Sequence, residues 1–221
     1  MHKIIRYLVR LSENNNREWF LQHHGEFSEI QSIFACEVKR IMDIIGEVDP
    51  RVKDMPVKKC LLRITRDMRF ASKDDAPFKT GLTAIIAPYG RFNRFPAYCI
   101  QMEQGKSYVA GGLLQYSPTS RLAVRKHIVN HLERYQQIVH DEEFARLFPV
   151  IGGEPLKKLP ARFKRDEPYT PYLYAGEFMV KYKIPDREFS KPKWQDHLGH
   201  VMQVMKPFLD FIDEAIAEEK E

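Results

Sequence analysis

The chain has 221 residues, of which 43% are hydrophobic and 12% aromatic, and its formal net charge is +5. This composition excludes an intrinsically disordered chain, and no run of residues approaches the roughly 20 apolar positions that a membrane-spanning helix needs. The mildly basic balance permits contact with nucleic acid or with small anions but does not require it.

The cysteines predict a reducing environment. Cys36, Cys60 and Cys99 are odd in number, far apart and without a CxxC pair, which disfavours both a disulfide framework and a zinc site. Residues 2–11 are apolar but interrupted by two arginines, so they lack the continuous core of a signal peptide. We therefore expect a cytoplasmic protein.

The N-terminal part has the pattern of two helices. Apolar residues recur at helical spacing over residues 2–11 and over residues 17–48, with a break expected at Gly25. Short amide side chains at residues 14–16 are typical of the end of one helix and the cap of the next. Asp49-Pro50 is expected to end the second helix.

The middle third changes to a strand pattern. Strands are predicted over residues 60–70, 82–87, 96–103 and 107–114. The third and fourth are joined by a short turn in which Gly105 is free to take a positive φ. Short connections between consecutive strands favour an antiparallel sheet.

The C-terminal part returns to helices. One helix is predicted from Ser117-Pro118 with a break near Asn130, and a short helix follows Asp141. A long connection, a strand over residues 177–184 and a final helix over residues 190–219 follow, and we expect Pro207 to kink or split that helix. The prediction is one α+β domain, residues 1–221, in which N- and C-terminal helices cover a mostly antiparallel sheet of four or five strands.

The predicted strand over residues 60–70 is rich in arginine. Because side chains alternate along a strand, Arg63, Thr65, Asp67 and Arg69 share one face in the middle of the sheet. The opposite face is apolar except for Arg66. Buried guanidinium groups need partners. Two interpretations stay open: a structural ladder of ion pairs around Asp67, or a site that binds an external anion through Arg63 and Arg69.

The anion interpretation defines the candidate site. Arginine presents a planar fork that fits phosphate and carboxylate groups, and lysines near the strand exit add charge. The predicted ligand is small and anionic, phosphorylated ligands included, and Asp67 is the candidate acid or base if a reaction takes place. The candidate binding residues are Arg63, Arg66, Arg69, Lys73 and Lys79.

Several segments together resemble the bacterial and fungal family filed as domain of unknown function 2461. They are residues 15–20 (NNREWF), residues 63–70 (RITRDMRF) running into Lys73, residues 76–80 (APFKT), the glycine pair before Leu113 and the late strand near Lys181. The resemblance covers nearly the whole chain and implies an α+β fold, but it brings no catalytic roles. The chain departs from the family pattern at Thr65. The pattern has an aromatic residue, typically Tyr, at this position between the first two arginines, whereas this chain has Thr.

No cofactor or metal is expected. His127 and His131 are four residues apart and His197 and His200 are three apart, but neither pair belongs to an HExxH motif. The chain has no GxGxxG, Walker A or GxSxG motif, so the nucleotide-fold and hydrolase classes lack support.

Two other functional classes remain. The first is a nucleic-acid-associated module, with Arg91 and Arg94 on a phosphate-contacting surface and exposed Phe92, Phe95 and Tyr98 stacking on bases. Such binding is expected to be weak and independent of sequence, because no recognised nucleic-acid-binding motif is present. The second is an interaction protein whose basic face docks an acidic partner. The sequence specifies neither an enzymatic reaction nor an oligomeric state.

Overall fold

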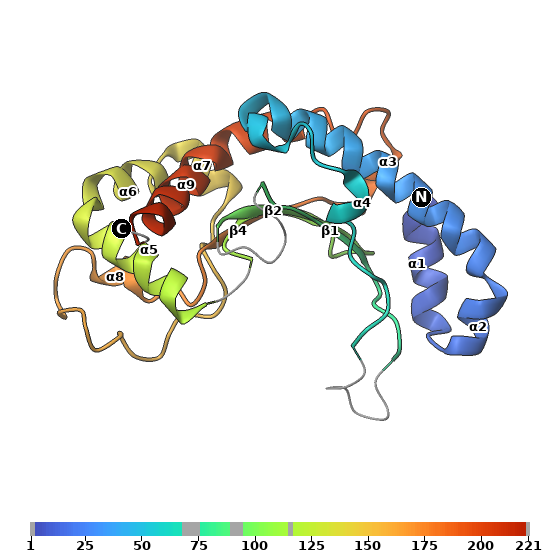
Figure 1. Cartoon of the computed structure of the whole chain (residues 1–221), viewed down its shortest axis with the longest axis horizontal. Coiled ribbons are helices and arrows are strands. Elements are labelled where there is room, and N and C mark those ends of the chain that lie inside the picture. Colours follow the sequence, from blue (N-terminus) through green and yellow to red (C-terminus); the bar gives the residue numbers. More distant parts are fainter. Residues whose placement is uncertain (1–2, 68–75, 89–94, 115–116, 220–221) are drawn as a thin grey trace. The chain divides into compact units, whose positions relative to one another are not determined.

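The computed structural model describes residues 3–67, 76–88, 95–114 and 117–219 (Figure 1). The helices are α1 (Lys3–Glu13), α2 (Arg17–Gln22), α3 (His24–Val48), α4 (Val57–Cys60), α5 (Pro118–Asn130), α6 (Leu132–Val139), α7 (Glu142–Leu147), α8 (Thr170–Leu173) and α9 (Leu198–Glu218). The strands are β1 (Leu82–Ile86), β2 (Ala97–Met102), β3 (Tyr108–Gly112) and β4 (Met179–Lys183). The predicted α+β class is confirmed.

The strands form one antiparallel sheet in the order β1-β2-β3-β4. Three of its strands come from the predicted middle segment and the fourth from the predicted late strand. Gly105 takes a φ of 66° in the turn between β2 and β3, as expected. The Ser107 hydroxyl closes this turn because it donates to the Glu103 carbonyl at 2.7 Å. The hairpin prediction is therefore confirmed.

The chain divides into two compact units. The first comprises residues 1–86, 99–109 and 183–199, and the second comprises residues 87–98, 110–182 and 200–221. The division passes through β2, β3 and β4, so each unit contains part of the sheet. The expectation of one domain stays a prediction, and the two units are described separately.

The first unit is built on the long helix α3. Its apolar residues recur every three, four or seven positions and are buried, and α1 packs on the same helix (Figure 1). α3 also contacts β1 and α4. The Asn16 side chain caps α2, because it accepts a hydrogen bond from the Trp19 amide at 2.9 Å. The break between the two helices lies at His23, not at Gly25.

The second unit contains the remaining helices. α5 ends at Asn130 and Asp141 caps α7, both as predicted. α9 begins at Leu198 and not at residue 190, and it continues through Pro207 without being split. β3 lies close to α9, because a Cβ atom at Gly111 would stand 2.4 Å from the Met205 sulfur.

The predicted strand over residues 60–70 is not a regular strand. Cys60 ends α4, and residues 61–66 form only isolated antiparallel bridges, Leu61 to Ala84 and Thr65 to Phe78, with a bend at Ile64. Leu61 pairs with Ala84 of β1, the terminal strand of the sheet, so this segment lies at an edge and not in the middle. Ile64 is buried as predicted, whereas Arg63 is exposed. Arg66 is exposed as well, so neither the Arg63 nor the Arg66 guanidinium group carries the cost of burial that the sequence suggested.

Among the described residues, none of the helices combines the length and the apolar character that crossing a bilayer requires.

Candidate functional site

Two segments that are far apart in the sequence meet at Phe78 in the first unit. The side-chain amide of Asn15 donates to the Phe78 carbonyl at 3.0 Å, and the Phe78 amide donates back to Asn15 Oδ1 at 3.1 Å. Arg66 Nε donates to the same carbonyl at 3.2 Å. One backbone position thus joins the start of α2, the arginine-rich segment and the segment before β1.

The backbone explains why Phe78 is available to Asn15. The Arg66 amide donates to the Pro77 carbonyl at 2.9 Å, and the Lys79 amide donates to the Ile64 carbonyl at 2.8 Å. These bonds flank the Thr65–Phe78 bridge, so Phe78 occupies a non-hydrogen-bonded pair and its own amide and carbonyl point away from Thr65. Asn15 occupies the place that a neighbouring strand would take.

A hollow of about 310 Å³ lies beside this junction. α2 contributes one side of it, and the paired segments around residues 65 and 78 contribute the other. Its lining residues are Arg17, Phe20, Leu21, Thr65, Arg66, Pro77 and Phe78. The volume is at the lower end of the range for small-molecule sites, about 300–1,000 Å³.

The apolar part of the hollow is aromatic and ordered. The rings of Phe20 and Phe78 are stacked, with centroids 4.1 Å apart and planes inclined by 22°. Phe78 is only 5% exposed, whereas Leu21 is 72% exposed at the edge. A rigid aromatic pair with an accessible apolar rim is suited to contact with an apolar part of a ligand.

The charged part of the hollow is positive. Arg17 and Arg66 both line it, and within the described residues neither guanidinium group has a carboxylate partner. The bond from Nε to the Phe78 carbonyl orients the Arg66 side chain, and its terminal nitrogens keep their donor capacity. Two guanidinium groups beside an aromatic pair are suited to an anion that carries an apolar substituent.

Comparison with known proteins places the chain in a family. The family described as conserved hypothetical protein (DUF2461) matches residues 3–211. The chain belongs to this family. The resemblance drawn from the sequence is thereby confirmed. No curated protein matches the chain, and no solved structure matches it.

Three of the segments that carry the DUF2461 resemblance meet at the hollow. Residues 15–20 supply Arg17 and Phe20, and residues 76–80 supply Phe78. Thr65, the position where the chain departs from the family pattern, is also in the lining. Its side chain is much smaller than a tyrosine ring, so the departure leaves space in the hollow.

The predicted binding residues do not all gather at this hollow. Arg66 lines it, but Arg63 lines a separate hollow of about 360 Å³ together with Lys58. Lys79 is half-buried and lines neither hollow, and Asp67 is exposed at the end of a described segment. Arg69 and Lys73 lie outside the described residues.

Sequence reasoning missed Arg17 and Phe20 as site residues. Both stand in the segment NNREWF, one of the segments that carry the family resemblance, and this was the available signal. What the sequence did not show was that Asn15 bonds to Phe78, 63 positions away. Without that contact, Arg17 has the appearance of an ordinary exposed residue in the first turn of a helix.

A hollow in the second unit provides a contrast. Its volume is about 420 Å³, and its lining includes both Arg134 and Asp141. Charges of opposite sign are present there, so it lacks the positive excess of the hollow at Arg17 and Arg66. The latter is therefore the better candidate for an anion.

Proposed function

We propose that this DUF2461 protein binds a small organic anion in the hollow between α2 and the Phe78 segment. The phosphate or carboxylate group of the ligand contacts Arg17 and Arg66, and its apolar part lies against Phe20 and Phe78. The observation that carries the proposal is that two guanidinium groups without carboxylate partners among the described residues share one hollow with an aromatic stack. The proposal concerns binding and assigns no reaction.

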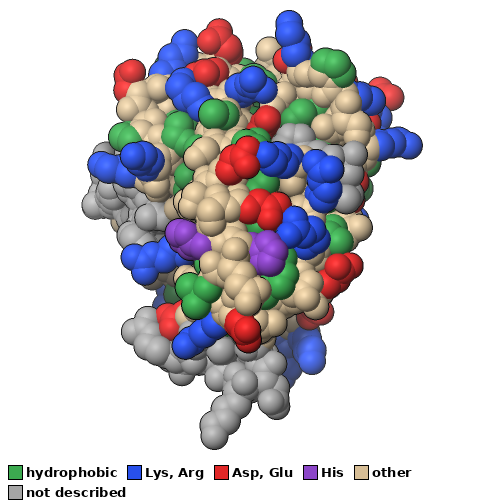
Figure 2. Space-filling model, turned by 90° about the vertical axis from the view of Figure 1, so that its right-hand side faces the viewer, with side chains coloured by type: hydrophobic (Ala, Val, Ile, Leu, Met, Phe, Trp, Pro, Cys, Tyr) green, Lys and Arg blue, Asp and Glu red, His purple; other side chains and the backbone are tan. Residues whose placement is uncertain are grey.

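The charge distribution supports a small ligand over nucleic acid. Figure 2 shows acidic and basic side chains interspersed on the face that carries the N-terminal helices, and the described residues there form no continuous basic surface. Tyr98, expected to be exposed for base stacking, is only 1% exposed, so that part of the alternative was wrong. Phe95 is half-buried, while Arg91, Phe92 and Arg94 lie outside the described residues.

The cellular location is part of the same proposal. We propose a cytoplasmic protein, supported by three cysteines that form no disulfide. This fits a reducing compartment.

The test is a thermal-shift series with four probes at matched ionic strength: sodium chloride, inorganic phosphate, phenyl phosphate and neutral benzyl alcohol. Phenyl phosphate is expected to raise the melting temperature most, because it addresses both the guanidinium groups and the aromatic pair. Inorganic phosphate is expected to have a smaller effect. Equal shifts with chloride and with both phosphates would contradict the proposal.

Three variants locate the effect. Arg66→Lys replaces a planar fork by a point charge, and losing a charge-assisted hydrogen bond costs about 1.5–3 kcal/mol. Binding of phenyl phosphate should therefore weaken by roughly ten-fold or more. Thr65→Tyr is expected to weaken it by filling the hollow. Arg63→Lys is the matched control, because Arg63 lines the other hollow; equal losses in Arg63→Lys and Arg66→Lys would rule out this location.

A further inference from the structure

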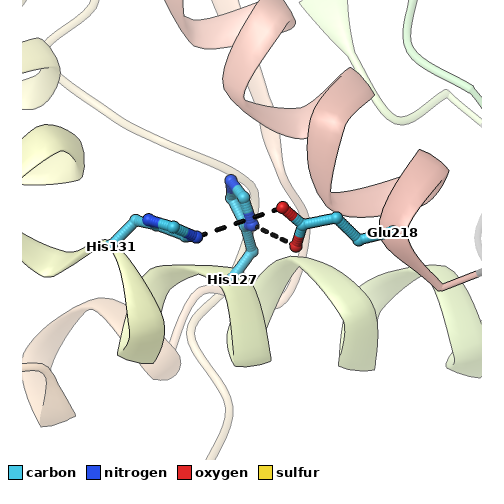
Figure 3. A group of neighbouring side chains, drawn as sticks. All are labelled: His127, His131 and Glu218. Carbon is cyan, nitrogen blue, oxygen red and sulfur yellow. Dashed lines mark hydrogen bonds and ion pairs between the residues drawn. The ribbon is translucent and has the colours of Figure 1, made fainter.

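Three potential metal ligands come together in the second unit. His127 lies in α5, His131 follows directly at the end of that helix, and Glu218 is the last residue of α9. The donor atoms of the three side chains all lie within 4.8 Å of one another. Figure 3 shows both imidazole rings and the Glu218 carboxylate converging on the same small region.

Helix geometry pairs the two histidines. The His131 amide donates to the His127 carbonyl at 2.8 Å, so the two residues stand one helical turn apart. Side chains at this spacing are neighbours on a helix surface, and the ring centroids of His127 and His131 are 4.3 Å apart. A pair of histidines four residues apart is the arrangement with which a helix supplies two ligands to one ion.

The distances suit an ion held between the side chains. His127 Nδ1 lies 2.8 Å from one carboxylate oxygen of Glu218, and His131 Nε2 lies 4.0 Å from the other. Ligand bonds of about 2.0–2.1 Å in tetrahedral geometry place donor atoms about 3.3 Å apart. The observed separations lie on either side of this value, so small side-chain rotations bring all three donors to bonding distance.

The surroundings of His127 have the form of an outer ligand shell. Its side chain is 2% exposed, and among the described residues its buried Nε2 has no hydrogen-bond partner. A Glu214 carboxylate oxygen lies 3.8 Å from this nitrogen, and Arg134 holds that carboxylate through two donors, one of them at 2.8 Å. In metal sites the second nitrogen of a ligating histidine usually faces such a carboxylate.

We propose that His127, His131 and Glu218 bind one divalent first-row transition-metal ion such as Zn²⁺. Two imidazoles and one carboxylate favour these ions over Mg²⁺ and Ca²⁺, which prefer oxygen ligands alone. Three protein ligands leave at least one coordination position open. The proposal replaces the expectation of no metal, which rested on the absence of an HExxH motif at either histidine pair. Glu218 is 87 positions from His131, so only the fold supplies it.

The test uses the full chain purified without a histidine tag and freed of metal with a chelator. Isothermal titration with Zn²⁺ should give one ion per chain, and Co²⁺ should give the visible absorption bands of a protein-bound ion. Mg²⁺ and Ca²⁺ at the same concentration should give neither heat of binding nor a thermal shift. Affinity for Zn²⁺ should fall as the pH is lowered, because ligation requires neutral imidazoles.

Variants separate this site from other histidines. His131→Ala and Glu218→Gln change exposed side chains, so both should fold and both should lose the Co²⁺ bands. Their affinity for Zn²⁺ should fall by more than the roughly 10–100-fold that is typical of losing an outer-shell partner. The affinity of the Glu214→Gln variant for Zn²⁺ should fall by an amount within that range. His200→Ala is the matched control, because in the described part of the chain His200 contacts one carboxylate, that of Glu143 at 2.8 Å.

Two results would overturn the proposal. The first is a wild-type chain that does not bind Zn²⁺, in which case the contact between His127 and Glu218 is only a structural hydrogen bond. The second is Zn²⁺ binding that survives both His131→Ala and Glu218→Gln or is lost in His200→Ala, in which case the ion sits elsewhere. Neither result bears on the anion site, because that site lies in the other compact unit.

Discussion

Replacing Asn15 by alanine should destabilise the first compact unit, because the Asn15 side chain holds the backbone of Phe78. The variant loses two hydrogen bonds, at 3.0 and 3.1 Å. The Phe78 carbonyl keeps its bond from Arg66 Nε, but the Phe78 amide loses its acceptor. A net hydrogen bond contributes about 0.5–1.5 kcal/mol, and a buried group left without a partner costs about 1–3 kcal/mol.

These terms give a loss of about 2 kcal/mol for Asn15→Ala. For a protein of this size, the melting temperature falls by about 2–4 °C for each kcal/mol, so we expect a decrease of about 4–8 °C. Urea unfolding followed by tryptophan fluorescence suits the measurement. The chain has two tryptophans, Trp19 and Trp194, and both belong to the first unit. The midpoint should fall without a change in the slope of the transition.

The matched control is Gln22→Ala, which removes an exposed amide from the other end of α2. Among the described residues the Gln22 side chain makes no hydrogen bond, so its effect should stay within about 0.5 kcal/mol. An Asn15→Ala midpoint equal to that of Gln22→Ala would refute the account of Phe78 as the junction of the two segments. It would also remove the reason for placing Arg17 and Arg66 at one hollow.

Two glycines and one buried hydroxyl give the remaining predictions. Gly112→Ala should cost about 3 kcal/mol or more, because φ is 136° and a Cβ atom would stand 2.2 Å from the Phe178 carbonyl oxygen. Gly25→Ala, at an open helical position, should instead stabilise by about 0.5–1 kcal/mol; urea midpoints followed by circular dichroism compare the two. Burial raises the pKa of Tyr7 from 10.0 to about 12. The unfolded state therefore loses the phenol proton at a lower pH than the folded state, and the free energy of unfolding falls as pH rises from about 10 toward 12. The Tyr7 hydroxyl has no partner among the described residues, so Tyr7→Phe should be at least as stable as wild type and should lack that alkaline loss, measured as urea midpoints at pH 8 and 11.

The α+β class and most of the elements could be predicted because they depend on local patterns. The apolar stripe of α3, the Asp141 cap of α7 and the turn at Gly105 each need only residues close together in the sequence. The exceptions follow from tertiary packing. Pro207 does not split α9, since the neighbours of a buried helix can compensate for one missing hydrogen bond. Residues 61–66 contain strand-forming residues but lie at the sheet edge, where pairing is sparse.

The sequence by itself determined that the arginine-rich segment is a candidate binding site and that the segments NNREWF and APFKT belong to the same family pattern. Only the tertiary structure decided which residues meet. It placed Arg66 and Arg17 at the same hollow and Arg63 at a different one. It also brought Glu218 close to His127 and His131, which have no third ligand near them in the sequence. The physical reason is that strand alternation and helical spacing describe contacts within one element. Contacts across 63 or 87 positions depend on backbone hydrogen bonds and core packing, which no local pattern records.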